Sequence, residues 1–127
     1  MVGDKISNLI ISLKNGSMVK KESITVPYFK IYESILKVLE TNNFIDSFKI
    51  DGRDILINLK YDEKDNSVIS DVRRVSKLSK RVYKPAKDIK LVKSGYGIAV
   101  LTTPEGVMCD KTAREKNVGG EIMFQIW

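Results

Sequence analysis

The chain has 127 residues, of which 43% are hydrophobic, and 22 lysines and arginines against 16 aspartates and glutamates give it a formal net charge of +6. This length and composition support one compact domain or two small ones with a real core, and argue against a disordered chain. No apolar run approaches the roughly 20 residues of a membrane span, so we expect no membrane partner. The first residues do not resemble a signal peptide and a single cysteine cannot form an internal disulfide, so we expect a cytoplasmic protein.

The first half predicts two helices and three short strands. Apolar residues recur at helical spacing from Ile6 to Leu13, with Asp4 as the expected N-cap and Gly16 as the expected end. A short β-prone stretch, 23–26, precedes Pro27, and a second amphipathic helix should end near Asn42-Asn43. Alternating apolar residues on both sides of Asp51-Gly52 predict a hairpin. These elements predict a small α/β sandwich.

Residues 62–67 contain no apolar side chain and form the best candidate for a boundary. We therefore expect an N-terminal α/β domain over residues 1–64 and a C-terminal β-rich domain over residues 65–127.

The second half predicts mostly antiparallel strands and one short helix. A strand over 69–75 and a basic connection lead to an apolar strand at 98–101 and a turn over Thr102-Thr103-Pro104-Glu105-Gly106. Asp110 should cap a short helix, and Val118-Gly119-Gly120 should end it. Ile122, Phe124 and Ile126 alternate with other residues in a last strand. The fold class is therefore α+β with two small domains.

Residues that could carry out catalysis are missing from the sequence. The chain has no histidine, and Cys109 stands alone, so we expect no nucleophile pair, no metal site and no cofactor. Gly95-Tyr96-Gly97 is too short for a dinucleotide fingerprint and precedes a strand, so it predicts a turn. We do not expect an enzyme.

Charge indicates the kind of partner. Between Arg73 and Lys93, nine basic residues accompany one acid, Asp88, a net charge of +8 in 21 residues. Such a segment favours a polyanion. Lys77 and Arg81 lie in it beside Tyr83, whose ring could be core or could stack on a base. Hydroxyls and amides at the 102–106 turn would suit the shallow minor groove of an RNA helix.

The chain resembles the bacterial small-subunit ribosomal protein eight family, the universal S-eight family, over essentially its whole length. The segments that carry the resemblance are Arg81-Val82-Tyr83, Gly95 to Ala99, Gly106 to Asp110, Ala113-Arg114, Val118 to Glu121 and the terminal Trp127.

This resemblance implies a two-domain structural protein of the ribosome that binds the central domain of 16S ribosomal RNA and supports 30S assembly, beside neighbouring small-subunit proteins. It also implies repression of its own operon mRNA. The RNA-binding residues that the charge pattern and the resemblance together suggest are Thr102, Thr103, Pro104, Gly106, Tyr83, Lys77, Arg81, Gly120, Glu121, Lys5 and Lys30.

Some residues depart from the family pattern. Pro104 stands where the family usually has a serine, which removes one hydroxyl and one amide donor, and Leu78-Ser79 replaces a frequent Pro-Gly. Two other functions stay open at this point. One is a free-standing RNA-binding regulator, and the other is a protein module whose basic face docks an acidic partner.

Overall fold

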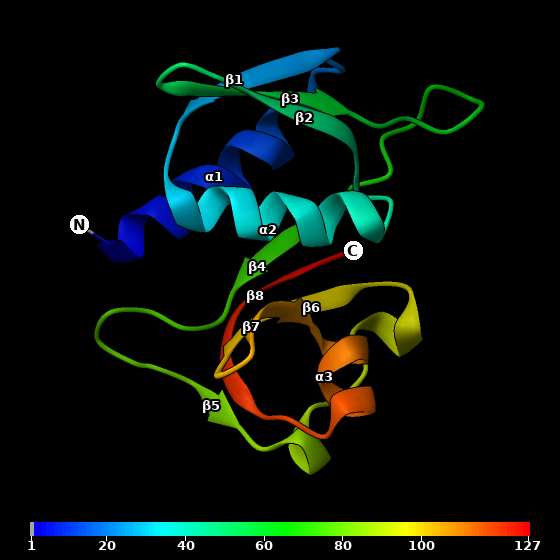
Figure 1. The fold of residues 1–127 in the computed structure, drawn as a ribbon. Coiled ribbons are helices and arrows are strands. Elements are labelled where there is room, and N and C mark those ends of the chain that lie inside the picture. Colours follow the sequence, from blue (N-terminus) through cyan, green and yellow to red (C-terminus); the bar gives the residue numbers. More distant parts are fainter. Residues whose placement is uncertain (1) are drawn as a thin grey trace. The chain divides into compact units, whose positions relative to one another are not determined.

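The computed structural model describes residues 2–127 and has the predicted α+β class (Figure 1). Its contacts divide the chain into two compact units, unit 1 (Met1–Ser70) and unit 2 (Asp71–Trp127). This division falls six residues after the boundary expected from composition. Residues 65–70 stay with unit 1 because the loop folds back on itself: Ser67 pairs with Tyr61, and the Val68 amide donates to the Lys60 carbonyl.

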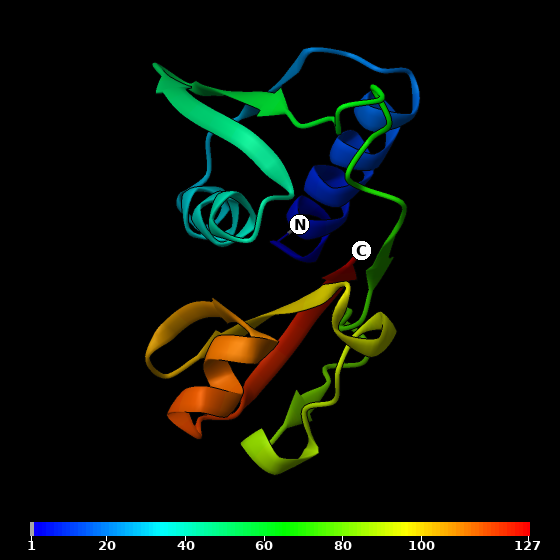
Figure 2. The ribbon, with the colours of Figure 1, turned by 90° about the vertical axis from the view of Figure 1, so that its right-hand side faces the viewer.

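Unit 1 contains two helices and a three-stranded antiparallel sheet with the strand order β1-β3-β2. Both helices lie on the same face of this sheet, as the views in Figures 1 and 2 agree. The core between them is mainly aliphatic, as the helical and alternating patterns predicted, and also contains Tyr32 and Phe44. The elements are α1 (Val2–Met18), β1 (Ser23–Pro27), α2 (Lys30–Thr41), β2 (Ile45–Asp51) and β3 (Asp54–Leu59).

Helix α1 is longer than its sequence signals predicted. It begins at Val2, so Asp4 lies inside the helix, and it continues through Gly16 to Met18. Gly16 has a packing role instead: a Cβ there would lie 2.7 Å from the Ile24 side chain and 3.1 Å from that of Leu59. The expectation of a helix end at Gly16 was therefore wrong, because the glycine lets the helix approach the sheet closely.

The β2–β3 hairpin follows its prediction. Asp51 pairs with Asp54 across the turn, and Gly52, the first residue between them, has a φ of +63°. Glycine adopts this backbone conformation without steric cost, which is why Asp-Gly signalled the turn.

Unit 2 is an antiparallel sheet organised around its last strand. The strand order is β4-β8-β6-β7, and β5 also pairs with β8. Helix α3 packs over a core that includes Ala99, Leu101, Met108 and Ala113. The elements are β4 (Val72–Arg74), β5 (Tyr83–Lys84), the 3₁₀ turns η1 (Ala86–Asp88) and η2 (Lys93–Gly95), β6 (Ile98–Thr103), β7 (Gly106–Cys109), α3 (Asp110–Lys116) and β8 (Gly120–Ile126).

Asp110 is the first residue of α3 and Cys109 is its N-cap, so the prediction that Asp110 is the N-cap was wrong by one residue. The Asp110 carboxylate is fully buried, where it accepts hydrogen bonds from the Ala99 amide at 3.1 Å and from Arg114 at 2.9 Å. Asp110 thus ties α3 to β6.

Candidate functional site

Three segments that are distant in sequence meet at one hollow on the surface of unit 2, which we call the β5–β8 hollow. It has a volume of about 440 Å³. Its walls come from β5, from the end of β6 with the following turn, and from the start of β8. The lining residues are Tyr83, Lys84, Pro85, Thr102, Thr103, Pro104, Gly119, Gly120 and Glu121. Six of them are among the eleven predicted RNA-binding residues.

Strand register explains why these residues meet. Glu121 on β8 pairs with Tyr83 on β5 and with Thr102 on β6. Paired residues in an antiparallel sheet point to the same face, so these three side chains form a row across three strands. Tyr83 is 65% exposed and Thr102 is exposed as well. The question left open by the sequence is therefore answered, because Tyr83 is not a core residue.

The two glycines at the start of β8 allow its neighbours to approach. A Cβ on Gly120 would lie 2.3 Å from the Thr102 carbonyl oxygen, and one on Gly119 would lie 2.5 Å from the Lys84 carbonyl oxygen. No side chain tolerates such distances to backbone atoms. The floor of the hollow is therefore formed by closely packed main chain.

The two threonines of β6 have different surroundings. Thr103 is only 7% exposed, and its hydroxyl donates to the Gly106 carbonyl at 2.8 Å and accepts from the Glu105 amide at 3.1 Å. It therefore closes the turn, which Gly106 completes with a φ of +117°. The Thr102 hydroxyl lies on the exposed side and is the one that the turn offers to a ligand.

Arg81 is held in place by Glu121. One guanidinium nitrogen donates to both carboxylate oxygens, at 3.1 and 3.3 Å, and the Arg81 side chain is about half exposed. An exposed ion pair of this kind contributes less than about 1 kcal/mol to stability. Its effect is to fix the direction of a cationic group at the edge of the β5–β8 hollow.

The remaining predicted residues lie outside the β5–β8 hollow. Lys77 and Lys80 pair with each other across a tight hairpin, and both side chains are exposed. Lys5 and Lys30 belong to unit 1, where the Lys5 ammonium lies 4.1 Å from the centre of the Phe29 ring, one residue before Lys30.

The predicted RNA-binding residues omit three lining residues, Lys84, Pro85 and Gly119. Lys84 was visible only as one member of the basic segment, and its pairing with Gly120 across β5 and β8 depends on long-range register. The pairing could have been predicted only if the central position of β8 in the sheet had been known, and no local sequence signal gives that position.

Cys109 is buried and lies 3.5 Å from the Thr112 hydroxyl. Among residues 2–127, no group of three or more His, Cys, Asp or Glu residues could hold a metal ion. The helices of this same range are also too short or too polar to cross a membrane.

Comparison with known proteins gives full-length matches. A family model described as Ribosomal protein S8 matches residues 4–127. The protein named small ribosomal subunit protein uS8 of Helicobacter pylori (strain Shi470) is 40% identical, that of Wolinella succinogenes 41%, and that of Helicobacter acinonychis (strain Sheeba) 40%. Each comparison covers 100% of this chain and 100% of the relative.

Proposed function

Because the chain belongs to the ribosomal protein S8 family and is a protein of the small ribosomal subunit, we propose that it binds the central domain of 16S ribosomal RNA directly and supports assembly of the 30S subunit. Members of this family are structural proteins and not enzymes. The identity over the full length with small-subunit proteins favours this role over that of a free-standing regulator or of a module for an acidic protein.

The observation that carries the proposal is the convergence at the β5–β8 hollow. An exposed tyrosine and an exposed threonine lie on either side of Glu121 in one row across three strands, and Glu121 holds Arg81 at the edge of the hollow. The row offers a ring for stacking, a hydroxyl for the 2′-hydroxyls of a shallow minor groove, and a cation for phosphate.

Affinity and register would come from different groups. The exposed Lys77 and Lys80 would neutralise phosphates, which gives affinity without sequence preference. The Thr102 hydroxyl and the Tyr83 ring, whose positions are fixed by the sheet, would set the register of the stem against unit 2. We also propose contact from Lys5 and Lys30 of unit 1.

Chemical footprinting tests the proposal. The purified chain, added to protein-free 16S RNA, should protect one stem of the central domain. Tyr83→Ala and Thr102→Ala should raise the protein concentration needed to protect that stem, by about fivefold for the loss of one hydrogen bond. Lys49→Ala, on the hairpin of unit 1, should leave that concentration unchanged. Failure of the folded chain to protect any central-domain stem at low salt would refute direct binding.

The proposal extends to repression of the protein's own operon mRNA, if that mRNA carries a stem resembling the ribosomal one. The two RNAs should then compete for one site, and Tyr83→Ala should weaken both to the same degree. Binding of the mRNA that persists when Tyr83→Ala abolishes rRNA binding would show a separate site.

A further inference from the structure

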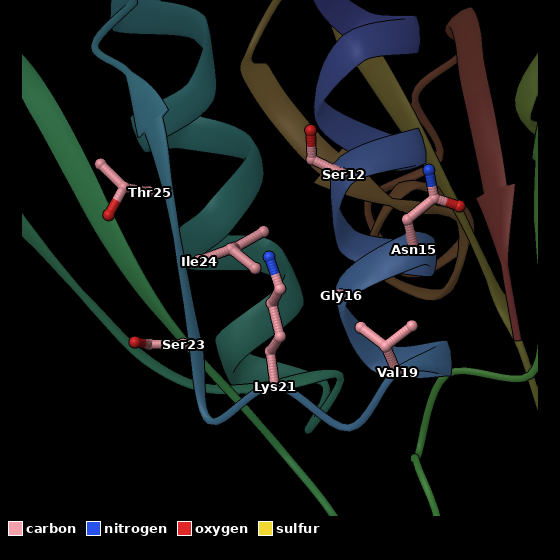
Figure 3. A pocket seen from close by; sticks show the side chains of 8 residues that line it. All are labelled: Ser12, Asn15, Gly16, Val19, Lys21, Ser23, Ile24 and Thr25. Atoms are coloured by element: carbon pink, nitrogen blue, oxygen red, sulfur yellow. The ribbon is translucent and has the colours of Figure 1, made fainter.

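Unit 1 has a groove that the proposed RNA contacts do not use. It lies between the second half of α1 and strand β1, with a volume of about 570 Å³. Figure 3 shows Ile24 pointing from β1 toward the helix, and Lys21 extending into the space between them. The lining residues are Ser12, Asn15, Gly16, Val19, Lys21, Ser23, Ile24 and Thr25. We call it the α1–β1 groove.

One wall of this groove is the free edge of a sheet. The order β1-β3-β2 leaves β1 with a single neighbour, and no other described strand pairs with it. The amide of Leu59 donates to Glu22 and that of Tyr28 to Arg53, so the even-numbered residues of β1 are those bonded to β3. In an antiparallel ladder the alternate residues, Ser23 and Thr25, direct their N–H and C=O groups to the other side.

An unpaired strand edge is a template for another extended chain. Natural edges are commonly blocked by proline or by an inward charge. In β1 the proline comes only at the last position, Pro27, which leaves the donors of Ser23 and Thr25 intact. Beside the edge, Val19 is 67% exposed and Ile24 is partly exposed, so the groove has an apolar strip for the side chains of an incoming strand.

Charge restricts the occupant further. Lys21 is the only charged residue of the lining. It stands between Lys20 and Glu22 in the sequence, so the local net charge is +1. A second copy of this chain would bring the same lysines together, and each copy carries a net charge of +6. RNA has no alternating N–H and C=O groups with which to extend a ladder. The groove therefore fits an extended polypeptide from a different protein, with an acidic side chain near Lys21.

We propose that the α1–β1 groove receives an extended, acidic segment of a neighbouring protein of the small subunit, which pairs with the free edge of β1 at Ser23 and Thr25. The inference depends on membership of the subunit and not on the RNA contacts of unit 2, so the two proposals can fail separately.

Hydrogen exchange, resolved to single residues by mass spectrometry, tests the pairing. The amides of Ser23 and Thr25 are followed in the free chain, in the chain bound to protein-free 16S RNA, and in the complete small subunit. We expect fast exchange in the first two states, and exchange slower by at least about tenfold in the third. Protection already present on RNA alone, or missing from the complete subunit, would overturn the proposal.

A pair of charge reversals tests the acidic partner. Lys21→Glu should reduce the protection of Ser23 and Thr25 in the complete subunit by at least about threefold, as loss of an exposed ion pair predicts. Lys49→Glu, an equal charge change at an exposed position of β2, should not. The unfolding midpoint of each variant establishes that it is folded. Equal effects of both reversals would contradict a specific acidic contact.

Discussion

At the scale of single residues, neighbouring threonines have separate tasks. Thr102 is exposed beside Tyr83 and Glu121, whereas the hydroxyl of Thr103 is occupied within its own turn. Sequence reasoning grouped the two because both are hydroxyls in a predicted turn. Only the strand register, which alternates the faces of successive residues, separates the one that can reach a ligand from the one that closes the chain.

Alanine substitutions should separate these tasks. Thr102→Ala should weaken binding to the 16S stem by about 1 kcal/mol, the usual value of one hydrogen bond, with no change in stability. Thr103→Ala should instead lower the free energy of unfolding by about 1–2 kcal/mol, because the two hydrogen bonds that the buried Thr103 hydroxyl makes with the Gly106 carbonyl and the Glu105 amide are lost. Filter binding and urea unfolding measure the two quantities. Thr103→Ser, which keeps the hydroxyl, is the control for the turn.

Gly120 should tolerate no side chain. Gly120→Ala places a Cβ about 2.3 Å from the Thr102 carbonyl oxygen, so we expect unit 2 to lose about 3 kcal/mol of stability or to shift β6 away from β8. Gly52→Ala is the matched control, since its Cβ would meet open space and its cost would be only that of a positive φ. Similar unfolding free energies for the two variants would argue against crowding at Gly120.

At the scale of elements, buried Asp110 joins α3 to the sheet. Asp110→Ala leaves the buried Ala99 amide without its acceptor and Arg114 with only the Ile89 carbonyl, so we expect a loss of about 3 kcal/mol in urea unfolding. Glu105→Ala removes the exposed pair with Lys116, whose charged atoms are 3.9 Å apart, and should cost less than about 1 kcal/mol. Equal losses would mean that burial does not distinguish the two carboxylates.

The loop that follows β3 is closed by Asp62, whose carboxylate accepts hydrogen bonds from the Asn66 and Lys64 amides. These bonds lower the pKa of Asp62 below its ordinary value. A carboxyl whose folded pKa is depressed stabilises the fold above its unfolded pKa, and this contribution is lost as the pH falls through the folded pKa. Asp62→Asn should therefore make the free energy of unfolding fall less as the pH is lowered through the acid range. Urea unfolding at a series of acid pH values measures this, and the same pH dependence in the variant and the original chain would contradict the role of Asp62.

The sequence predicted most elements of both units because their signals are local. Helical spacing located α1 and α2, alternation located β2, β3 and β8, and Asp-Gly located the hairpin. The errors came where long-range contacts decide the outcome. Gly16 has the residue type of a helix end but serves helix–sheet contact, and the strand expected over 69–75 is Val72–Arg74, since the preceding loop remains attached to unit 1.

At the scale of the whole molecule, charge should govern the strength of RNA binding. If about five phosphates are contacted, affinity should fall several hundred-fold between 50 and 200 mM salt, from a slope near −0.9 for each phosphate. Lys77→Ala should reduce that slope by about one and weaken binding to every duplex alike. Lys49→Ala removes the same charge from unit 1 and is the control. A filter-binding series with no salt dependence would exclude the phosphate contacts.

The main-chain floor of the β5–β8 hollow has a consequence for how this surface can evolve. Because Gly119 and Gly120 let three strands pack backbone against backbone, the form of the hollow does not depend on the side chains at its rim. Lining residues such as Lys84 and Pro104 can then be exchanged without loss of the hollow. A saturation mutagenesis scan scored by growth should find that the lining side chains tolerate substitution and that Gly119 and Gly120 do not. RNA specificity could then change during evolution while the backbone of the hollow stays the same.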